Sequence, residues 1–177
     1  PLDYDSLRNT SRGGAISSAY NDTIDKIEAN ERMKDEEKKE YIDRCKYVLS
    51  SVYSDLKQLD KSIETLEALV ASQPDNASYQ NDLGYLLADN GRRLDDAQKM
   101  IEKALELDKA DRTKMLDEGL ISPDEDVANS AYLDSLAWAL HRLGRNSEAE
   151  AAMRKAKAEN LRFLFYSPEM NARIADS

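Results

Sequence analysis

Side chains that could do chemistry are few in this sequence and lie far apart. The only histidine is His141, so a metal site with two histidine ligands is excluded. Asp134 lies two helical turns before it, but no nucleophile accompanies the pair, and we interpret His141 as a surface or groove residue. The only cysteine, Cys45, has no neighbouring motif that would lower its pKa, so we predict buried packing rather than reactivity.

Two further patterns invite comparison with ligand-binding loops. Acidic residues gather at Asp117, Glu118 and 124–126, but the alternating ligands, turn glycine and closing glutamate of a calcium loop are missing. The pair Gly13-Gly14 has neither a preceding strand nor the lysine of a phosphate-binding loop. We therefore predict a solvated acidic loop, and we expect no catalytic residue, no metal and no cofactor.

The composition favours long helices as the elements that position these side chains. The 177 residues include 41% hydrophobic and 34% charged residues, but only 6 glycines and 4 prolines. So few turn-forming residues leave little opportunity for many short strands. The chain is long enough for one domain with a continuous core.

The charge balance limits the classes of partner. With 25 basic and 35 acidic residues the net charge is −10, which disfavours nucleic acid and anionic membrane surfaces. No apolar stretch approaches the roughly 20 residues that span a bilayer, so membrane insertion is not expected. One cysteine cannot form an internal disulfide, and the start at Pro1 is compatible with a removed upstream segment, so the compartment stays undecided.

A helix–turn–helix pattern occurs twice along the chain. Residues 79–87 (YQNDLGYLL) align with residues 132–140 (YLDSLAWAL), and a Gly-Arg pair follows each at 91–92 and 144–145. Small residues then recur at matched positions: Ala97 and Ala104, then Ala149 and Ala156. Small residues let two antiparallel helices approach closely, and one such pair must stack on a neighbour to bury its apolar face.

These residues resemble the tetratricopeptide repeat (TPR), whose pattern is W-x2-L-G-x2-Y, then A-x3-F-x2-A, then proline. Units are predicted at 77–111 and 130–163, where Met153 takes the large position between the two alanines. A weaker unit at 43–76 lacks the signature small residues but keeps the closing proline. The resemblance implies an all-α fold, a right-handed α-solenoid of antiparallel helix pairs that spans 43–163.

Three segments fall outside these units. Residues 1–42 are predicted to form an N-terminal helical cap or partial repeat, with a helix over 14–33 and a second helix capped by Asp35. Residues 112–129 are an inserted loop whose first part can extend the preceding helix up to a stop at glycine. Residues 164–177 are predicted to be a C-terminal capping segment, with a short helix beginning at Ser167-Pro168-Glu169 and an aromatic run before it.

In the TPR family the first helix of each pair lines a concave groove that holds partner peptides. The resemblance places these residues there: Tyr47, Ser51, Asn81, Asp82, Tyr85, Ala88, Asp134, Ser135, Trp138, His141 and Arg142. Tyr85 and Trp138 occupy equivalent places beside the leucine stripes, either as binding hot spots or as rings packed on the next helix. The basic residues with which some family members clamp a C-terminal carboxylate are absent, which favours a neutral or basic partner.

The leading hypothesis is an interaction module, a scaffold or adaptor that binds a protein or peptide in its groove. The alternative is a structural segment of a larger protein that packs against its own neighbours or forms a homo-oligomer. An enzyme is not expected, because no acid–base constellation accompanies His141.

Overall fold

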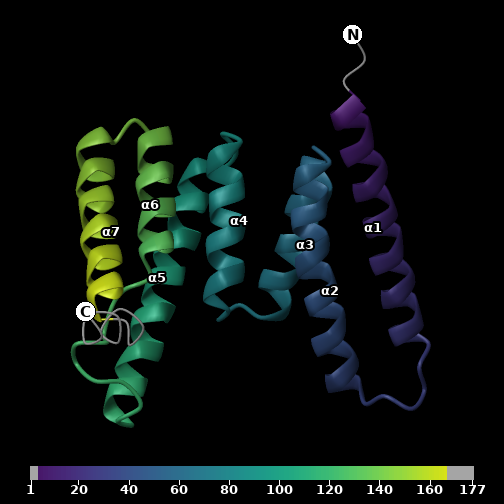
Figure 1. Cartoon of the computed structure of the whole chain (residues 1–177), viewed down its shortest axis with the longest axis horizontal. Helices are drawn as coiled ribbons and strands as arrows, with labels where there is room; N and C mark the ends of the chain where they lie inside the picture. The colour runs from purple at the N-terminus through teal and green to yellow at the C-terminus, as the bar shows by residue number, and fades with distance from the viewer. Residues whose placement is uncertain (1–3, 167–177) are drawn as a thin grey trace, which may run out of the picture. The chain divides into compact units, whose positions relative to one another are not determined.

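A computed structural model of the chain describes the backbone of residues 4–166 and the side chains of residues 11–161 (Figure 1). The described backbone contains seven helices and no strand, which confirms the predicted all-α class. The chain divides into two compact units, Pro1–Pro74 and Asp75–Ser177.

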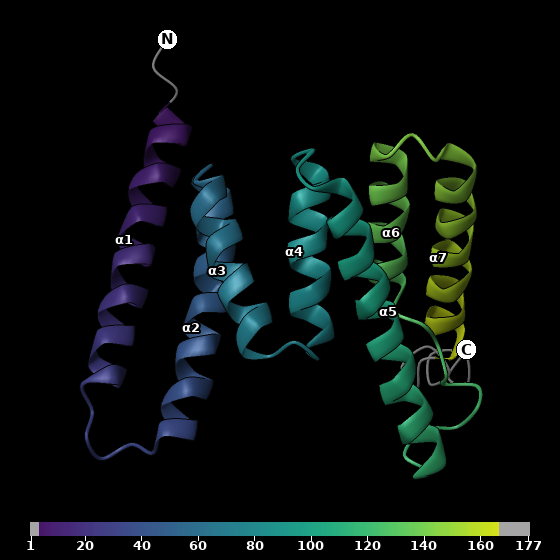
Figure 2. The same ribbon diagram turned by 180° about the vertical axis from the view of Figure 1, so that it is seen from behind.

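The first unit contains α1 (Tyr4–Glu28), α2 (Asp35–Asp55) and α3 (Leu59–Ser72). Helix α2 packs against both α1 and α3 (Figure 2). The predicted bounds of the first helix, 14–33, are wrong at both ends. Helix α1 begins earlier, because it continues through the glycine pair, and it also ends earlier, at Glu28. A Cβ atom at Gly13 would lie 2.7 Å from Leu56 Cδ2, so the missing side chain lets α1 approach α2 and offsets the poor helix propensity of glycine.

The start of α2 also differs from the prediction. Its N-cap is Lys34, which makes no side-chain capping hydrogen bond, and Asp35 is the first helical residue rather than the cap. Asp35, Glu36 and Glu37 therefore occupy the first turn, where negative charge stabilises the helix through its dipole.

In the first unit, Ser50 and Ser62 stand at the positions where the repeat pattern has glycine or alanine. Ser62 Oγ donates a hydrogen bond to the carbonyl oxygen of Ser50 at 2.7 Å, and both residues are buried. The carboxylate of Asp43, only 4% exposed, accepts hydrogen bonds from Ser72 Oγ and Gln73 Nε2 at 2.9 Å each. These bonds satisfy buried polar groups and join α2 to α3.

The second unit contains α4 (Ala77–Asp89), α5 (Leu94–Asp117), α6 (Ser130–Arg142) and α7 (Asn146–Tyr166). Helix α4 packs against α5 and α6, and α6 packs against α5 and α7. The α4–α5 pair is closely packed at Gly84, where a Cβ atom would lie 2.7 Å from Ile101 Cγ1 and 2.8 Å from the carbonyl oxygen of Ala97. Its core side chains are at most 1% exposed: Leu83, Leu87, Ala97, Ile101 and Ala104.

The same turn closes the first helix of all three pairs. A residue with positive φ ends α2, α4 and α6, and these residues are Lys57 (60°), Gly91 (66°) and Gly144 (77°). The next amide then donates to a carbonyl one turn and a half earlier: Gln58 to Tyr53, Arg92 to Leu87, and Arg145 to Leu140. This is the Schellman pattern, and its recurrence shows that the three pairs share one register.

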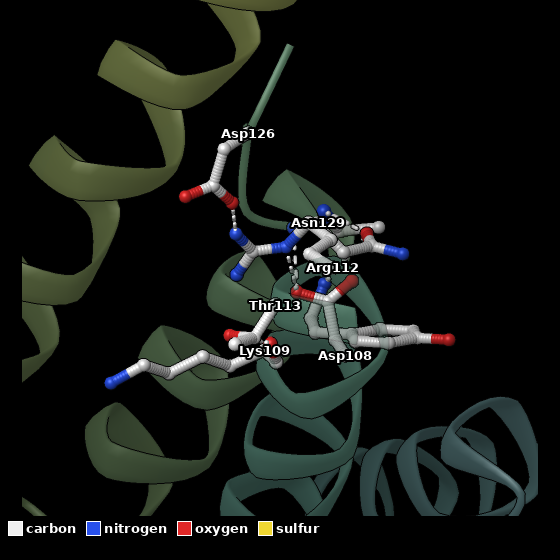
Figure 3. Close-up of polar contacts among 8 residues, drawn as sticks. Asp108, Lys109, Arg112, Thr113, Asp126 and Asn129 are labelled. Carbon is white, nitrogen blue, oxygen red and sulfur yellow. Dashed lines mark hydrogen bonds and ion pairs between the residues drawn. The ribbon is translucent and has the colours of Figure 1, made fainter. Parts of the chain in front are cut away.

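The segment 112–129 is helical at its start and a loop only after Gly119. Helix α5 runs to Asp117, and Gly119 then takes a φ of +68°. Arg112 Nε donates to Asp108 Oδ2 at 3.0 Å, and Arg112 Nη1 donates to Asp126 Oδ1 (Figure 3). The Arg112 side chain is only 18% exposed, so this cluster attaches the loop firmly to α5.

The acidic residues of this loop are thus partly engaged by their own surroundings. Glu125 Oε2 accepts hydrogen bonds from the Ser122 amide at 2.8 Å and from Ser122 Oγ at 2.9 Å. These two bonds lower the pKa of the Glu125 carboxyl below its usual value. The predicted short helix from Ser167 and the side chains of 164–177 lie outside the described residues.

Candidate functional site

Two asparagine caps set the register of the helices that carry the predicted groove residues. Asn76 Oδ1 accepts a hydrogen bond from the Tyr79 amide at 3.2 Å, before α4. Asn129 Oδ1 accepts from the Ala131 and Tyr132 amides at 3.0 and 3.4 Å, before α6. Asn129 follows Asn76 by the same number of residues as Trp138 follows Tyr85. Each ring therefore lies equally far from the cap of its own helix.

A hollow of about 930 Å³ lies between α4, α6 and the beginning of α7. The residues that line it are Tyr85, Asp89, Asp134, Ala137, Trp138, His141, Asn146, Ser147, Ala149, Glu150 and Met153. Tyr85 is 44% exposed and Met153 is 48% exposed, while Trp138 is half-buried. The hollow therefore offers aromatic and thioether surface to a ligand that approaches from solvent.

Trp138 is held in place by its neighbours on α6. The guanidinium of Arg142 lies 5.7 Å from the centre of the indole ring, and the His141 ring lies 5.6 Å from it. Arg142 Nη1 also donates to the carbonyl oxygen of Asp89 at 2.6 Å, which caps the end of α4. A Cβ atom on Gly91 would lie 2.8 Å from Arg142 Nη2, so the glycine leaves room for this contact.

The charges that line the hollow are acidic. Asp89, Asp134 and Glu150 contribute carboxylates, and the lining residues include neither lysine nor arginine. Glu150 lies 3.7 Å from Arg154 in an exposed pair, which contributes little at such exposure. The positive charge of Arg142, beside the indole, offsets these carboxylates only in part. The balance favours a positively charged ligand group.

The structure brings four of the predicted groove residues together: Tyr85, Asp134, Trp138 and His141 all line the hollow. Three others are buried and offer little surface: Asn81 is 7% exposed, Ala88 is 0% exposed and Ser135 is 6% exposed. Ser135 Oγ donates to the Ala131 carbonyl within α6, Asp82 accepts from Asn81, and Arg142 caps α4. Tyr47 and Ser51 lie on α2 in the first unit, where Tyr47 is half-buried and Ser51 exposed.

The part of the hollow that α7 contributes was not predicted from the sequence. Met153 was aligned only with the large position of the repeat pattern, and the structure shows that it is 48% exposed and lines the hollow. Among the described helices, α7 packs only against α6. Asp89, one helical turn after Tyr85, could have been found from helical spacing alone.

Other chemistry is not supported by the described residues. Cys45 is 9% exposed, and burial raises the pKa of its thiol, which disfavours the reactive thiolate. Within the side chains of residues 11–161, no group of three or more histidine, cysteine or acidic residues could hold a metal ion. No helix in the described part of the chain is both long enough and apolar enough to span a membrane.

Comparison with known proteins connects this geometry to a family. The profile of the tetratricopeptide repeat matches residues 43–76, 77–111 and 131–160, which is more than half of the chain. The chain belongs to the tetratricopeptide repeat family. The three matched segments correspond to the helix pairs that share the Schellman turn. TPR folds are typically non-enzymatic modules for protein–protein interaction.

Two similar proteins extend the comparison. The TPR repeat-containing protein PA4667 of Pseudomonas aeruginosa is 34% identical over 109 residues, which is 62% of this chain. Those residues are only 15% of the length of PA4667, so the match concerns one portion of a much longer TPR protein. The crystal structure of MamA has a TM-score of 0.54 and 17% identity, and the alignment covers 91% of this chain and 81% of MamA. The likeness to MamA supports the helical-repeat fold.

Proposed function

We propose that this TPR protein is an interaction module that holds a segment of a partner protein in the hollow between α4, α6 and α7. The observation that supports the proposal best is the pair Tyr85 and Trp138. The two rings occupy equivalent positions on successive first helices, both line one hollow of about 930 Å³, and Tyr85 is 44% exposed. Large aromatic side chains that line a concave site are typical anchors in protein–protein interfaces.

The partner segment is neutral or basic rather than acidic. Asp89, Asp134 and Glu150 line the hollow, and the chain carries a net charge of −10. An acidic segment would be repelled by both. Tyr47 and Ser51, on α2 of the first unit, remain proposed partner contacts of that unit.

The test is an affinity capture with the wild-type chain and with a Tyr85→Ala/Trp138→Ala variant. A matched control is Tyr41→Ala, because Tyr41 is 45% exposed on α2 and is not among the residues that line the hollow. We expect the double variant to lose a partner that both the wild type and the control retain. Each lost partner is then titrated as a purified protein, and a loss of affinity of roughly tenfold or more in the double variant is expected. Identical partner sets for all three proteins would rule out the hollow as the binding site.

A second candidate function is self-association through α7. Met153 and Leu161 are 48% and 45% exposed on this helix, and exposed apolar side chains favour contact with another apolar surface. Sedimentation equilibrium of the wild type and of a Met153→Gln variant tests this candidate. A monomer at every concentration in both proteins would exclude it.

A further inference from the structure

The hollow combines aromatic surface with negative charge that Arg142 offsets only in part. Tyr85 and Asp89 lie one turn apart on α4, and Asp134 and Trp138 lie one turn apart on α6. Each helix thus supplies one ring and one carboxylate to the same space. Neither the Asp89 nor the Asp134 carboxylate has a hydrogen bond or an ion pair with the other described side chains. Both carboxylates are available to a ligand.

We propose that this hollow receives an arginine side chain of the partner segment. A guanidinium is planar, always charged and weakly hydrated, so it can stack on an aromatic face while its edge donates hydrogen bonds to carboxylates. An aromatic ring and a carboxylate on each of two adjacent helices match both of these properties. This inference rests on the proposed function and names the residue type that the module recognises.

The contact between Trp138 and Arg142 shows that a guanidinium can lie against an aromatic ring at this surface. Arg142 already lies 5.7 Å from the centre of the indole ring. Its Nη1 is committed to the Asp89 carbonyl at 2.6 Å, so Arg142 caps α4 and does not neutralise the Asp89 or Asp134 carboxylate directly. An incoming guanidinium therefore has Tyr85, which is 44% exposed, as its free aromatic surface. It meets the two carboxylates from the solvent side.

The size of the hollow fits more than the side chain alone. Ligand sites in proteins have volumes of about 300–1,000 Å³, and 930 Å³ lies at the upper end of that range. Such a volume holds an arginine side chain together with part of the backbone and one apolar neighbour, for which Met153 offers surface.

The chain offers a convenient probe, since Trp138 is its only tryptophan and gives a single indole N–H resonance in a ¹H–¹⁵N spectrum. We would titrate the full chain with a capped alanine pentapeptide that carries one central arginine. The same peptide with citrulline, which keeps the shape of arginine but is neutral, measures the contribution of charge. The same peptide with lysine separates guanidinium recognition from simple charge attraction.

We expect the arginine peptide to shift the indole resonance saturably, with an affinity roughly tenfold higher than that of the citrulline peptide and several-fold higher than that of the lysine peptide. Asp134→Asn should weaken arginine binding by about threefold to tenfold. The matched control is Asp111→Asn, which removes an equal charge from an exposed site on α5 outside the hollow and should leave the affinity unchanged. Dispersed spectra of both variants verify that they fold.

Equal affinities for the arginine and citrulline peptides, or equal losses in Asp134→Asn and Asp111→Asn, would overturn the proposal. So would the absence of any shift with the arginine peptide, or tighter binding of lysine than of arginine. These results are separable from the affinity capture. A partner that depends on Tyr85 and Trp138, combined with equal arginine and citrulline binding, retains the interaction module and rejects arginine as its anchor.

Discussion

Replacing Gly84 by alanine tests the packing on which the second unit depends. The added methyl carbon would lie 2.7 Å from Ile101 Cγ1 and 2.8 Å from the Ala97 carbonyl oxygen, closer than Cβ atoms are found in proteins. Because one of these neighbours is backbone, α4 and α5 must separate, and we place the cost in the upper part of the overpacking range, at ~2–3 kcal/mol. The better helix propensity of alanine returns ~1 kcal/mol. We therefore expect a net loss of about 1–2 kcal/mol of unfolding free energy.

Trp138 fluorescence is the suitable assay, because the only tryptophan of the chain lies in the second unit. A loss of this size should lower the urea midpoint of the fluorescence transition by about 0.5–1 M. The matched control is Gly14→Ala, where a Cβ atom would meet nothing within 4 Å. Here the same substitution should stabilise α1 by about 0.5–1 kcal/mol, measured by far-UV circular dichroism. If Gly84→Ala left the fluorescence midpoint unchanged or raised it, the close approach of α4 and α5 would be refuted.

Three further substitutions test other parts of the structure. Ala156→Leu should lower the free energy of unfolding by roughly 1–3 kcal/mol, because Ala156 is only 6% exposed. The control Ala151→Leu, on the exposed face of α7, should change the urea midpoint little, and equal effects of the two substitutions would show that the register of α7 is wrong. Glu148 accepts hydrogen bonds from Arg145, and these bonds lower the pKa of the Glu148 carboxyl. The small stabilisation from this pair is therefore present above the usual glutamate pKa and is lost as the pH falls through the lowered value. NMR titration should show the lowered pKa of Glu148, and Arg145→Gln should return it toward the usual range. Arg112→Met should free the loop after α5 and accelerate limited proteolysis there by about tenfold, and an unchanged cleavage rate would argue against the cluster in Figure 3.

The helical pairs could be predicted from sequence because their signal is local. Leu83 and Leu87 are almost fully buried, as their helical spacing indicated, and Ala97 and Ala104 are fully buried at the predicted close contacts. These positions repeat because each unit solves the same packing problem with the same residue types. Their identity alone is therefore informative.

Features that depend on neighbours were harder to predict. The repeat position of Met153 indicates burial, but its exposure depends on whether another helix covers that face of α7. The helix α1 was predicted too short, since propensity counts Gly13 as unfavourable and does not reveal its contact with Leu56. Likewise, Asn81 and Ser135 lie on the expected helices but are buried, because a helical wheel locates a face and not its accessibility.

The attachment of the loop after α5 has a consequence for how this chain can vary. Asp108 binds Arg112 and also accepts from the Asn129 amide at 3.4 Å, so the residue that caps α6 is anchored to α5 by side chains. The intervening stretch need not have any particular length to bring α6 back to its place. Insertions or deletions near Leu120, which is 65% exposed, should therefore be tolerated. The spacing in sequence between the α4–α5 pair and the α6–α7 pair can then vary while the contact between Asp108 and Asn129 still holds the two pairs together.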